Sequence, residues 1–216
     1  MIIMPYNNDG CSSCLFYDFE TTGLNPFHDE IIEYTFLGVA WGSISSLIHP
    51  KKMLSEKITK ITNITNDMLK DKPFIEDKID EIYDFIVDYY NNRCNIDVPY
   101  IYLIAHNNNS FDMFFFKRIF KLSKDPSKVE FINKHIRFID TLHLAKLVLP
   151  SMKSLKLKTL CKIYNIKEGN HRSYEDTYAL IFVYQKLLDE YTQYNNKYTF
   201  YTLFNNPHIV HTILYN

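Results

Sequence analysis

The order of the apolar segments is the feature that most constrains the fold of this chain. Three runs rich in β-branched and aromatic residues come first, at residues 15–19, 31–41 and 43–49. Their length and composition are typical of strands, and we expect them to form an antiparallel meander. Apolar residues then recur at alternating intervals of four and three from Ile75 to Tyr89, which predicts an amphipathic helix.

The second half of the sequence alternates between the two kinds of pattern. We predict strands at residues 100–105 and 135–139, and a helix that begins at Ser110 with its hydroxyl as the N-cap. Further helices are predicted at residues 55–62, 65–70, 140–149, 155–164 and 173–191. This order predicts an α/β layered domain in which helices flank a mixed five-stranded sheet.

Length and composition are those of one domain with a full core. The chain has 216 residues, 46% of them hydrophobic. We divide it into an irregular leader (1–13), a folded domain (14–191) and a C-terminal tail or cap (192–216), which is rich in Tyr, Asn and Phe without a firm period. The sequence has no run of 18 apolar residues and no signal-peptide pattern, so it predicts a soluble, intracellular protein without a membrane partner.

Charge and cysteine usage narrow the function classes. The net charge is −1 and the pI is about 6.7, which argues against a protein that coats DNA through a basic face. Cys11 and Cys14 form a lone Cys-x-x-Cys pair, and no second close pair follows to complete a zinc site. We interpret them as reduced thiols; the alternatives are a redox pair or half of a zinc site completed elsewhere.

Two carboxylates at the end of the first predicted strand carry the strongest chemical signal. Asp18 and Glu20 are two positions apart, so their side chains share one face of the strand. Burying two acids together is costly unless a cation neutralises them. The turn Thr21-Thr22-Gly23 follows directly.

Two later segments add the same chemistry. Asp112 lies at the start of a predicted helix, where the helix dipole favours a negative charge. His171 precedes Asp176 by five positions, and Asp176 falls in the first turns of the last predicted helix. The fold would have to bring all three segments together to form one acidic pocket.

At these residues the chain resembles the DnaQ-like 3′–5′ exonucleases, in the DEDDh subgroup named after four acids and a histidine. The resemblance runs from about Leu15 to about Leu188 and implies a ribonuclease H-like fold. The family pattern His-Asn-x-x-Phe-Asp is one residue longer here, from His106 to Asp112. The other subgroup carries Tyr four positions before the last acid, and Arg172 stands there instead.

The resemblance implies a reaction and a role for each residue. Asp18, Glu20, Asp112 and Asp176 would hold two Mg²⁺ or Mn²⁺ ions, and oxygen-rich ligation suits these metals. His171 would act as the general base in hydrolysis that releases mononucleotides from the 3′ end of single-stranded DNA. The expected substrate contacts, by resemblance, are Thr21, Thr22, His106 and Asn107.

Several alternatives stay open at this level. The same residues would serve an exoribonuclease that trims RNA 3′ ends, and a catalytically silent binding module of a replication complex is a different class. The enzyme could be a freestanding repair or processing nuclease, or a proofreading partner of a polymerase. The sequence leaves these choices and the oligomeric state undecided.

Overall fold

The computed structural model describes residues 13–94 and 97–216, and the predicted leader lies almost entirely outside them. Five strands form one sheet in the order β3-β2-β1-β4-β5. The β1–β2 and β2–β3 pairs are antiparallel, whereas β1–β4 and β4–β5 are parallel, so the prediction of a mixed five-stranded sheet is confirmed. The strands are β1 (Cys14–Thr21), β2 (Ile31–Gly38), β3 (Gly42–Leu47), β4 (Ile101–Ala105) and β5 (Ile136–Asp140).

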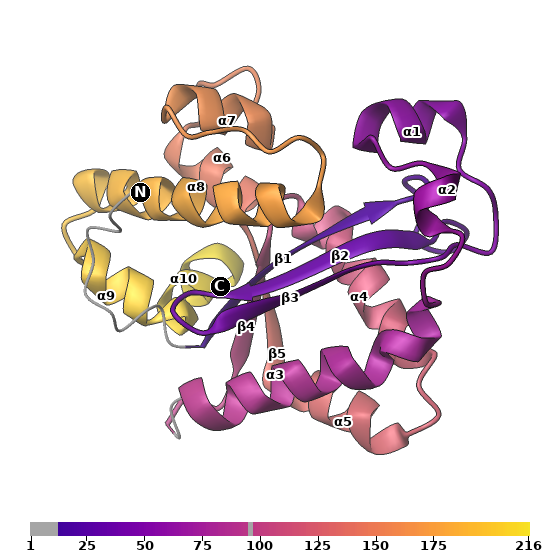
Figure 1. Cartoon of the computed structure of the whole chain (residues 1–216). Helices are drawn as coiled ribbons and strands as arrows, with labels where there is room; N and C mark the ends of the chain where they lie inside the picture. Colours follow the sequence, from indigo (N-terminus) through magenta and orange to yellow (C-terminus); the bar gives the residue numbers. More distant parts are fainter. Residues whose placement is uncertain (1–12, 95–96) are drawn as a thin grey trace.

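Helices cover both faces of this sheet (Figure 1). On one face lie α6 (Thr141–Val148), α7 (Leu157–Ile163) and α8 (Ser173–Tyr194). On the other lie α3 (Ile79–Arg93), α4 (Asp112–Lys121) and α5 (Pro126–His135). The remaining helices are α1 (Glu56–Thr62), α2 (Asn66–Leu69), α9 (Phe200–Asn205), α10 (Pro207–Tyr215) and the 3-10 turns η1 (Ile75–Lys78) and η2 (Asn108–Ser110).

The central strand β1 separates two cores. Phe16 packs in the core beneath α6, α7 and α8, and Leu15 and Tyr17 pack in the core beneath α3, α4 and α5. This alternation follows from the period of two along a strand, because β1 is covered on both faces. Asp18 and Glu20 have the parity of Phe16, so they project toward the face on which α8 lies.

Two local predictions were wrong, and one helix was missed. Ser110 is not the N-cap of α4: it ends the turn η2, and Phe111 occupies the cap position without a side-chain bond. The helix predicted from Ile75 begins there as a 3-10 turn and becomes α-helical only at Ile79. Helix α5 was not predicted, although Asp125 caps it and Pro126 opens it.

The C-terminal residues form two short helices, α9 and α10. Their buried residues Leu203, Phe204 and Val210 belong to the same core cluster as α8. No described helix is long and apolar enough to cross a bilayer. Cys14 is disulfide-bonded, so the prediction of a reduced thiol there was wrong, since spacing alone does not determine the redox state of a cysteine; Cys11 lies outside the described residues.

Candidate functional site

The carboxyl ends of the parallel strands bring the predicted acids together. Asp18 and Glu20 lie near the end of β1, opposite Thr35 and Glu33 of β2. The β1–β2 register shifts between Glu20 and Thr21, which is where the strand gives way to the following loop. Asp18 and Glu20 therefore lie at the carboxyl end of the central strand, close to the start of α8, and their side chains share one face of the sheet.

Asp112 reaches the site from the segment that follows β4. It is the first residue of α4 and only 2% exposed. Its Oδ1 atom is buried and has no hydrogen-bond partner in the described part of the chain. Such a buried acceptor is costly to leave unpaired, so it favours a ligand in the site.

Asp176 and His171 reach the site from the start of α8. One ligand atom each from Glu20, His171 and Asp176 lie within 4.8 Å of one another. His171 is exposed and has a positive φ of 53°, an uncommon conformation for a residue other than glycine. The loop thus turns sharply at His171 and directs its ring toward the acids.

Burial raises the pKa of all four carboxyl groups, and the charges of nearby acids raise it further. Burial, followed by the charge of Asp112, raises the pKa of Asp18 well above its usual value. Burial and the neighbouring acids raise the pKa of Glu20 to about 8. Burial is also the main cause that raises the pKa of Asp112 to about 8 and that of Asp176 to about 6. The four groups therefore occupy one electrostatic environment that resists their ionisation.

The donor set fits a divalent cation. Carboxylate oxygens are hard ligands, which suit ions such as Mg²⁺ and Mn²⁺. A bound cation would neutralise the clustered acids and give the unpaired Oδ1 of Asp112 a partner. The positive charge of the ion would offset the repulsion among the carboxylates.

Glu33 is a functional residue that the sequence analysis missed. It is 4% exposed on β2 and accepts hydrogen bonds from Arg172 Nε (3.0 and 3.1 Å) and Nη2 (2.6 Å). The backbone amide of Ser173, the first residue of α8, donates to the same carboxylate at 2.8 Å. Glu33 therefore fixes the backbone between His171 and Asp176. An acid within an otherwise apolar strand was the signal that could have revealed it.

Gly169 is a second residue that the sequence did not single out. A Cβ atom at position 169 would lie 1.9 Å from Oδ1 and 2.8 Å from the backbone nitrogen of Asp176. The loop backbone therefore passes directly against the carboxylate, and only glycine leaves room for it. Glu168 beside it pairs with Lys158 (3.1 Å) and Lys162 (3.7 Å) of α7, which ties the loop to that helix.

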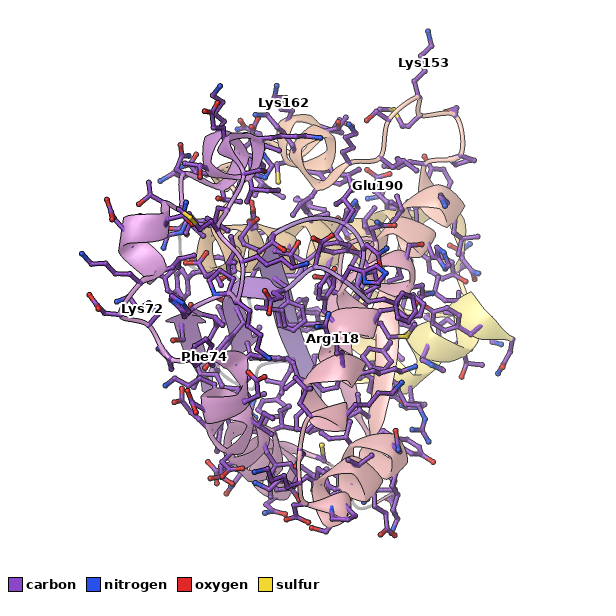
Figure 2. All side chains as sticks on the ribbon, turned by 90° about the vertical axis from the view of Figure 1, so that its right-hand side faces the viewer. Lys72, Phe74, Arg118, Lys153, Lys162 and Glu190 are labelled. Atoms are coloured by element: carbon purple, nitrogen blue, oxygen red, sulfur yellow. The ribbon has the colours of Figure 1, made fainter. Side chains whose placement is uncertain are left out.

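The loop after β1 holds Thr21 and Thr22 in a fixed turn. Thr21 Oγ1 donates to the carbonyl of Gly23 at 2.6 Å, and Thr22 Oγ1 donates to Asp29 Oδ1 at 3.1 Å. Arg118 extends from α4 (Figure 2), and its Nη1 donates to the carbonyls of Pro26 (2.9 Å) and Asp29 (2.7 Å). Both hydroxyls are thus used within the loop, and its backbone is the part that is held in place.

His106 and Asn107 lie in the segment between β4 and η2. His106 Nδ1 lies 2.9 Å from Thr141 Oγ1, and burial lowers the pKa of this histidine. The Asn107 amide donates to Asp140 Oδ1 at 2.9 Å, and its side chain is exposed. Neither side chain belongs to the group formed by Glu20, His171 and Asp176.

The neighbouring Asn108 has the role of joining strands. It is fully buried, accepts a hydrogen bond from the Tyr17 hydroxyl, and donates to the carbonyls of Leu103 (3.1 Å) and Ile139 (3.0 Å). It thereby connects β1, β4 and β5 directly beneath the acids. The additional residue of this motif is accommodated in η2, while Asp112 keeps its place at the start of α4.

Sequence comparison identifies the family. The family model described as "Exonuclease" matches residues 15–184. The PolC-type DNA polymerase III of Bacillus subtilis is 34% identical over 183 residues, and that of Thermotoga maritima is 31% identical over 185. The matches cover 81% and 83% of this chain but only 11% and 12% of the polymerases, so the chain corresponds to a small part of these relatives.

Solved structures share the fold. E. coli exonuclease I in complex with a dA16 oligonucleotide gives a TM-score of 0.65 at 22% identity, over 82% of this chain and 41% of that one. Exonuclease X in complex with 5′-overhanging duplex DNA gives 0.54 at 24% identity, over 89% and 98%. The chain therefore belongs to the DnaQ-like exonuclease family and has the ribonuclease H-like fold.

Proposed function

We propose that this chain removes mononucleotides from the 3′ ends of single-stranded DNA, with Asp18, Glu20, Asp112 and Asp176 holding two Mg²⁺ or Mn²⁺ ions. The observation that carries the proposal is the meeting of acids from β1, α4 and α8 beside His171. Divalent ions in such a site polarise the phosphate and lower the pKa of water. Each further step of the proposal concerns the chain's own residues.

His171 is the proposed general base. It is exposed to solvent, while one of its ring nitrogens lies within 4.8 Å of carboxylate oxygens of Glu20 and Asp176. An imidazole in this position can accept the proton of the attacking water as the bond to phosphorus forms. The contacts of Glu33 with Arg172 and Ser173 keep the backbone on either side of it in place.

The loop after β1 is the proposed contact for the terminal nucleotide. Its backbone is held by Thr21, Thr22 and Arg118, while Leu24 is 84% exposed and Phe27 is 77% exposed. Both side chains stand on the loop that follows the acids of β1, where a base of the strand could pack against them. Asn107 is a further proposed contact to the strand, because its side chain is exposed. His106, on the same segment, is proposed as well.

The relatives favour DNA as the substrate and a replication context. The related proteins are named DNA polymerases, and both structural neighbours described above are bound to DNA. We infer that this chain performs proofreading or repair, either alone or beside a polymerase partner. An exoribonuclease and a catalytically silent module are the alternatives that the experiment must exclude.

The direct test is degradation of matched 5′-labelled DNA and RNA strands of one sequence, side by side. We expect DNA to shorten from its 3′ end in Mg²⁺ or Mn²⁺, EDTA to stop the reaction, and a circular single strand to survive. Asp18→Asn serves as the matched control, because it keeps the shape of the side chain and removes its charge. Faster loss of RNA would support the exoribonuclease, and cutting of the circle would contradict exonucleolytic action.

The silent-module alternative has its own signature. Such a protein would bind the strand without releasing nucleotides, and Asp18→Asn would behave like the parent. Full activity in a folded Asp18→Asn protein would instead show that the acids are not the catalytic group. Neither result is expected from a site with four acids in repulsive contact.

A further inference from the structure

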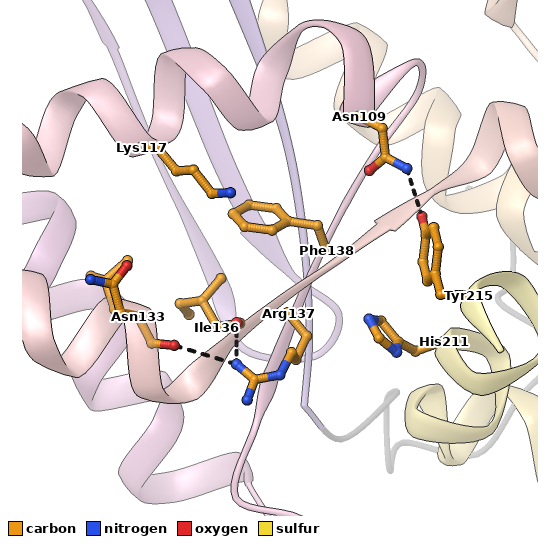
Figure 3. Close-up of a pocket in the computed structure, with 9 residues that line it drawn as sticks. Asn109, Lys117, Asn133, Ile136, Arg137, Phe138, His211 and Tyr215 are labelled. Atoms are coloured by element: carbon orange, nitrogen blue, oxygen red, sulfur yellow. Dashed lines mark hydrogen bonds between the residues drawn. The ribbon is translucent and has the colours of Figure 1, made fainter.

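A cavity lies along one edge of the sheet, outside the acidic site. Strand β5 is the edge strand, and a cavity of about 410 Å³ opens between it, α4, the end of α5 and α10 (Figure 3). Its lining reaches Asn109 of η2, the turn that leads into Asp112. The cavity and the acidic site thus share the segment between β4 and α4.

The cavity has an excess of positive charge. Lys117 of α4 and Arg137 of β5 line it, and none of the described residues around it is acidic. Within residues 13–94 and 97–216, neither cation forms an ion pair: Lys117 Nζ lies 5.3 Å from the centre of the Phe138 ring, and the Arg137 guanidinium lies 4.1 Å from that of Tyr100. The third basic residue, His211, has its pKa lowered by burial and by Arg137, so the charge comes from Lys117 and Arg137.

The position of Arg137 is fixed by the end of α5. Its Nη1 donates to the carbonyl of Ile136 at 2.7 Å and to that of Lys134 at 3.3 Å. Its Nε and Nη2 atoms make no hydrogen bond within the described chain, so they are available for an anion. A guanidinium held in this way presents two parallel donors to a phosphate.

Aromatic and amide groups complete the lining. Phe138 lies beside Lys117, and Tyr215 of α10 lies across the cavity from them, as Figure 3 shows. The Tyr215 hydroxyl accepts hydrogen bonds from Asn109 Nδ2 (3.2 Å) and from the Asp140 amide (3.1 Å), which orients the ring. Asn109 and Asn133 bring side-chain amides, which can pair with the polar edge of a base.

We propose that this cavity binds a nucleoside 5′-monophosphate unit. Lys117 and Arg137 hold the phosphate, and Phe138 and Tyr215 contact the base. The proposal rests on the proposed function, because both the single-stranded substrate and the released product of a 3′–5′ exonuclease contain this unit. The unit would belong either to the strand that leads to the acidic site or to a free mononucleotide.

Binding to the purified full chain tests the site itself. The Asp18→Asn substitution and EDTA together prevent hydrolysis, and the metal-free acidic site then holds no cation that could bind phosphate. Calorimetric titration should show that dAMP binds at least tenfold more tightly than either deoxyadenosine or inorganic phosphate. In the Asp18→Asn background, Lys117→Glu should weaken dAMP binding at least tenfold. Lys121→Glu should not, because Lys121 is an exposed residue of the same helix that lies outside the cavity.

A milder variant protects the test against misfolding. If Lys117→Glu unfolds, Lys117→Gln should still weaken dAMP binding by severalfold while keeping the circular dichroism of the parent. Equal binding of inorganic phosphate and dAMP would overturn the proposal in favour of a simple anion site. Absence of dAMP binding, or binding unchanged in the Lys117 variants, would overturn it entirely.

Kinetics of the active protein distinguish the two sources of the nucleotide. If the strand occupies the cavity, Lys117→Glu should raise KM about tenfold for a long oligonucleotide, but not for a dinucleotide, with kcat unchanged. If a free mononucleotide occupies it, KM should stay constant, and added dAMP should slow the parent but not Lys117→Glu. Because calorimetry requires no cleavage, an inactive parent would contradict the proposed function without affecting the binding result.

Discussion

At the scale of one residue, the carboxylate of Asp112 has the burial and the unpaired oxygen expected of a ligand to the proposed ion. One of its oxygens is buried without a partner, and its pKa is raised to about 8. An unsatisfied buried acceptor typically costs about 1–3 kcal/mol of stability. The unpaired oxygen lies where the proposed cation would be held, so a bound cation would offset this cost.

The first prediction isolates the imidazole. General-base catalysis typically contributes about 10²–10⁴-fold to a rate, so His171→Ala should reduce kcat on that order while the protein keeps its affinity for Mn²⁺. Steady-state kinetics and calorimetry measure the two quantities separately. His208→Ala on α10 is the matched control and should retain full activity. A His171→Ala rate within about threefold of the parent would show that the base lies elsewhere.

The second prediction concerns Gly169. The methyl group of Gly169→Ala would overlap the carboxylate of Asp176, so this acid must move away from the others. Because a displacement of about 1 Å can cost on the order of 10²-fold in rate, we expect a loss of about 10–100-fold in kcat and weaker Mn²⁺ binding. Asn170→Ala, an exposed neighbour, should change neither. Unaltered metal affinity in Gly169→Ala would argue against this contact.

At the scale of elements, periodic patterns were informative and the junctions between elements were not. The strands near residues 15–19 and 135–139 were predictable from their short apolar runs, and the helix through Tyr89 was predictable from its 3.6-residue period. The predicted N-cap at Ser110 was wrong because the turn η2 inserts before α4. Turns of this kind depend on tertiary contacts, here the hydrogen bonds of Asn108 to three strands.

The same distinction applies to the site. The acids could be located because they interrupt apolar segments in a recognisable spacing. Glu33 could not be assigned a role, since its partner Arg172 is 139 positions away along the chain. The approach of the Gly169 backbone to Asp176 is likewise a property of the folded loop and has no periodic signature.

The third prediction tests how α8 is positioned. Glu33→Gln removes the charge that Arg172 and the Ser173 amide share, so the free energy of unfolding should fall by about 2 kcal/mol, as for a lost hydrogen bond to a charged group. The rate should fall about tenfold, because His171 and Asp176 flank the freed segment. The double variant with Arg172→Gln should be less destabilised than the sum of the single changes. Strict additivity, measured by denaturant unfolding, would contradict the pairing.

At the scale of the whole molecule, the acidic site links stability to pH and metal. In the metal-free protein the pKa is about 8 for Glu20 and Asp112 and about 6 for Asp176, above the values near 4 expected in the unfolded chain. Groups with raised pKa stabilise the fold at low pH, and this contribution is lost as the pH rises through the folded values.

The fourth prediction follows from that sign. In EDTA, Tm should fall as the pH rises from 6 to 9, and added Mg²⁺ should restore it by a margin that grows over the same range. Thermal scans with and without Mg²⁺ measure this difference, and Asp112→Asn should reduce both trends. A Mg²⁺ effect on Tm that shrinks toward pH 9 would mean that the acids do not share a cation.

The late position of α8 also has a consequence for synthesis of the protein. Asp18 and Glu20 belong to the first strand, whereas Asp176 belongs to a helix that begins at Ser173 and packs over β1 and β2. At a translation rate of about 5–20 residues per second, roughly 8–30 s separate the appearance of these acids. During that interval the nascent chain lacks Asp176, so under the proposed function it should not cleave nucleic acid near the ribosome until α8 has been made.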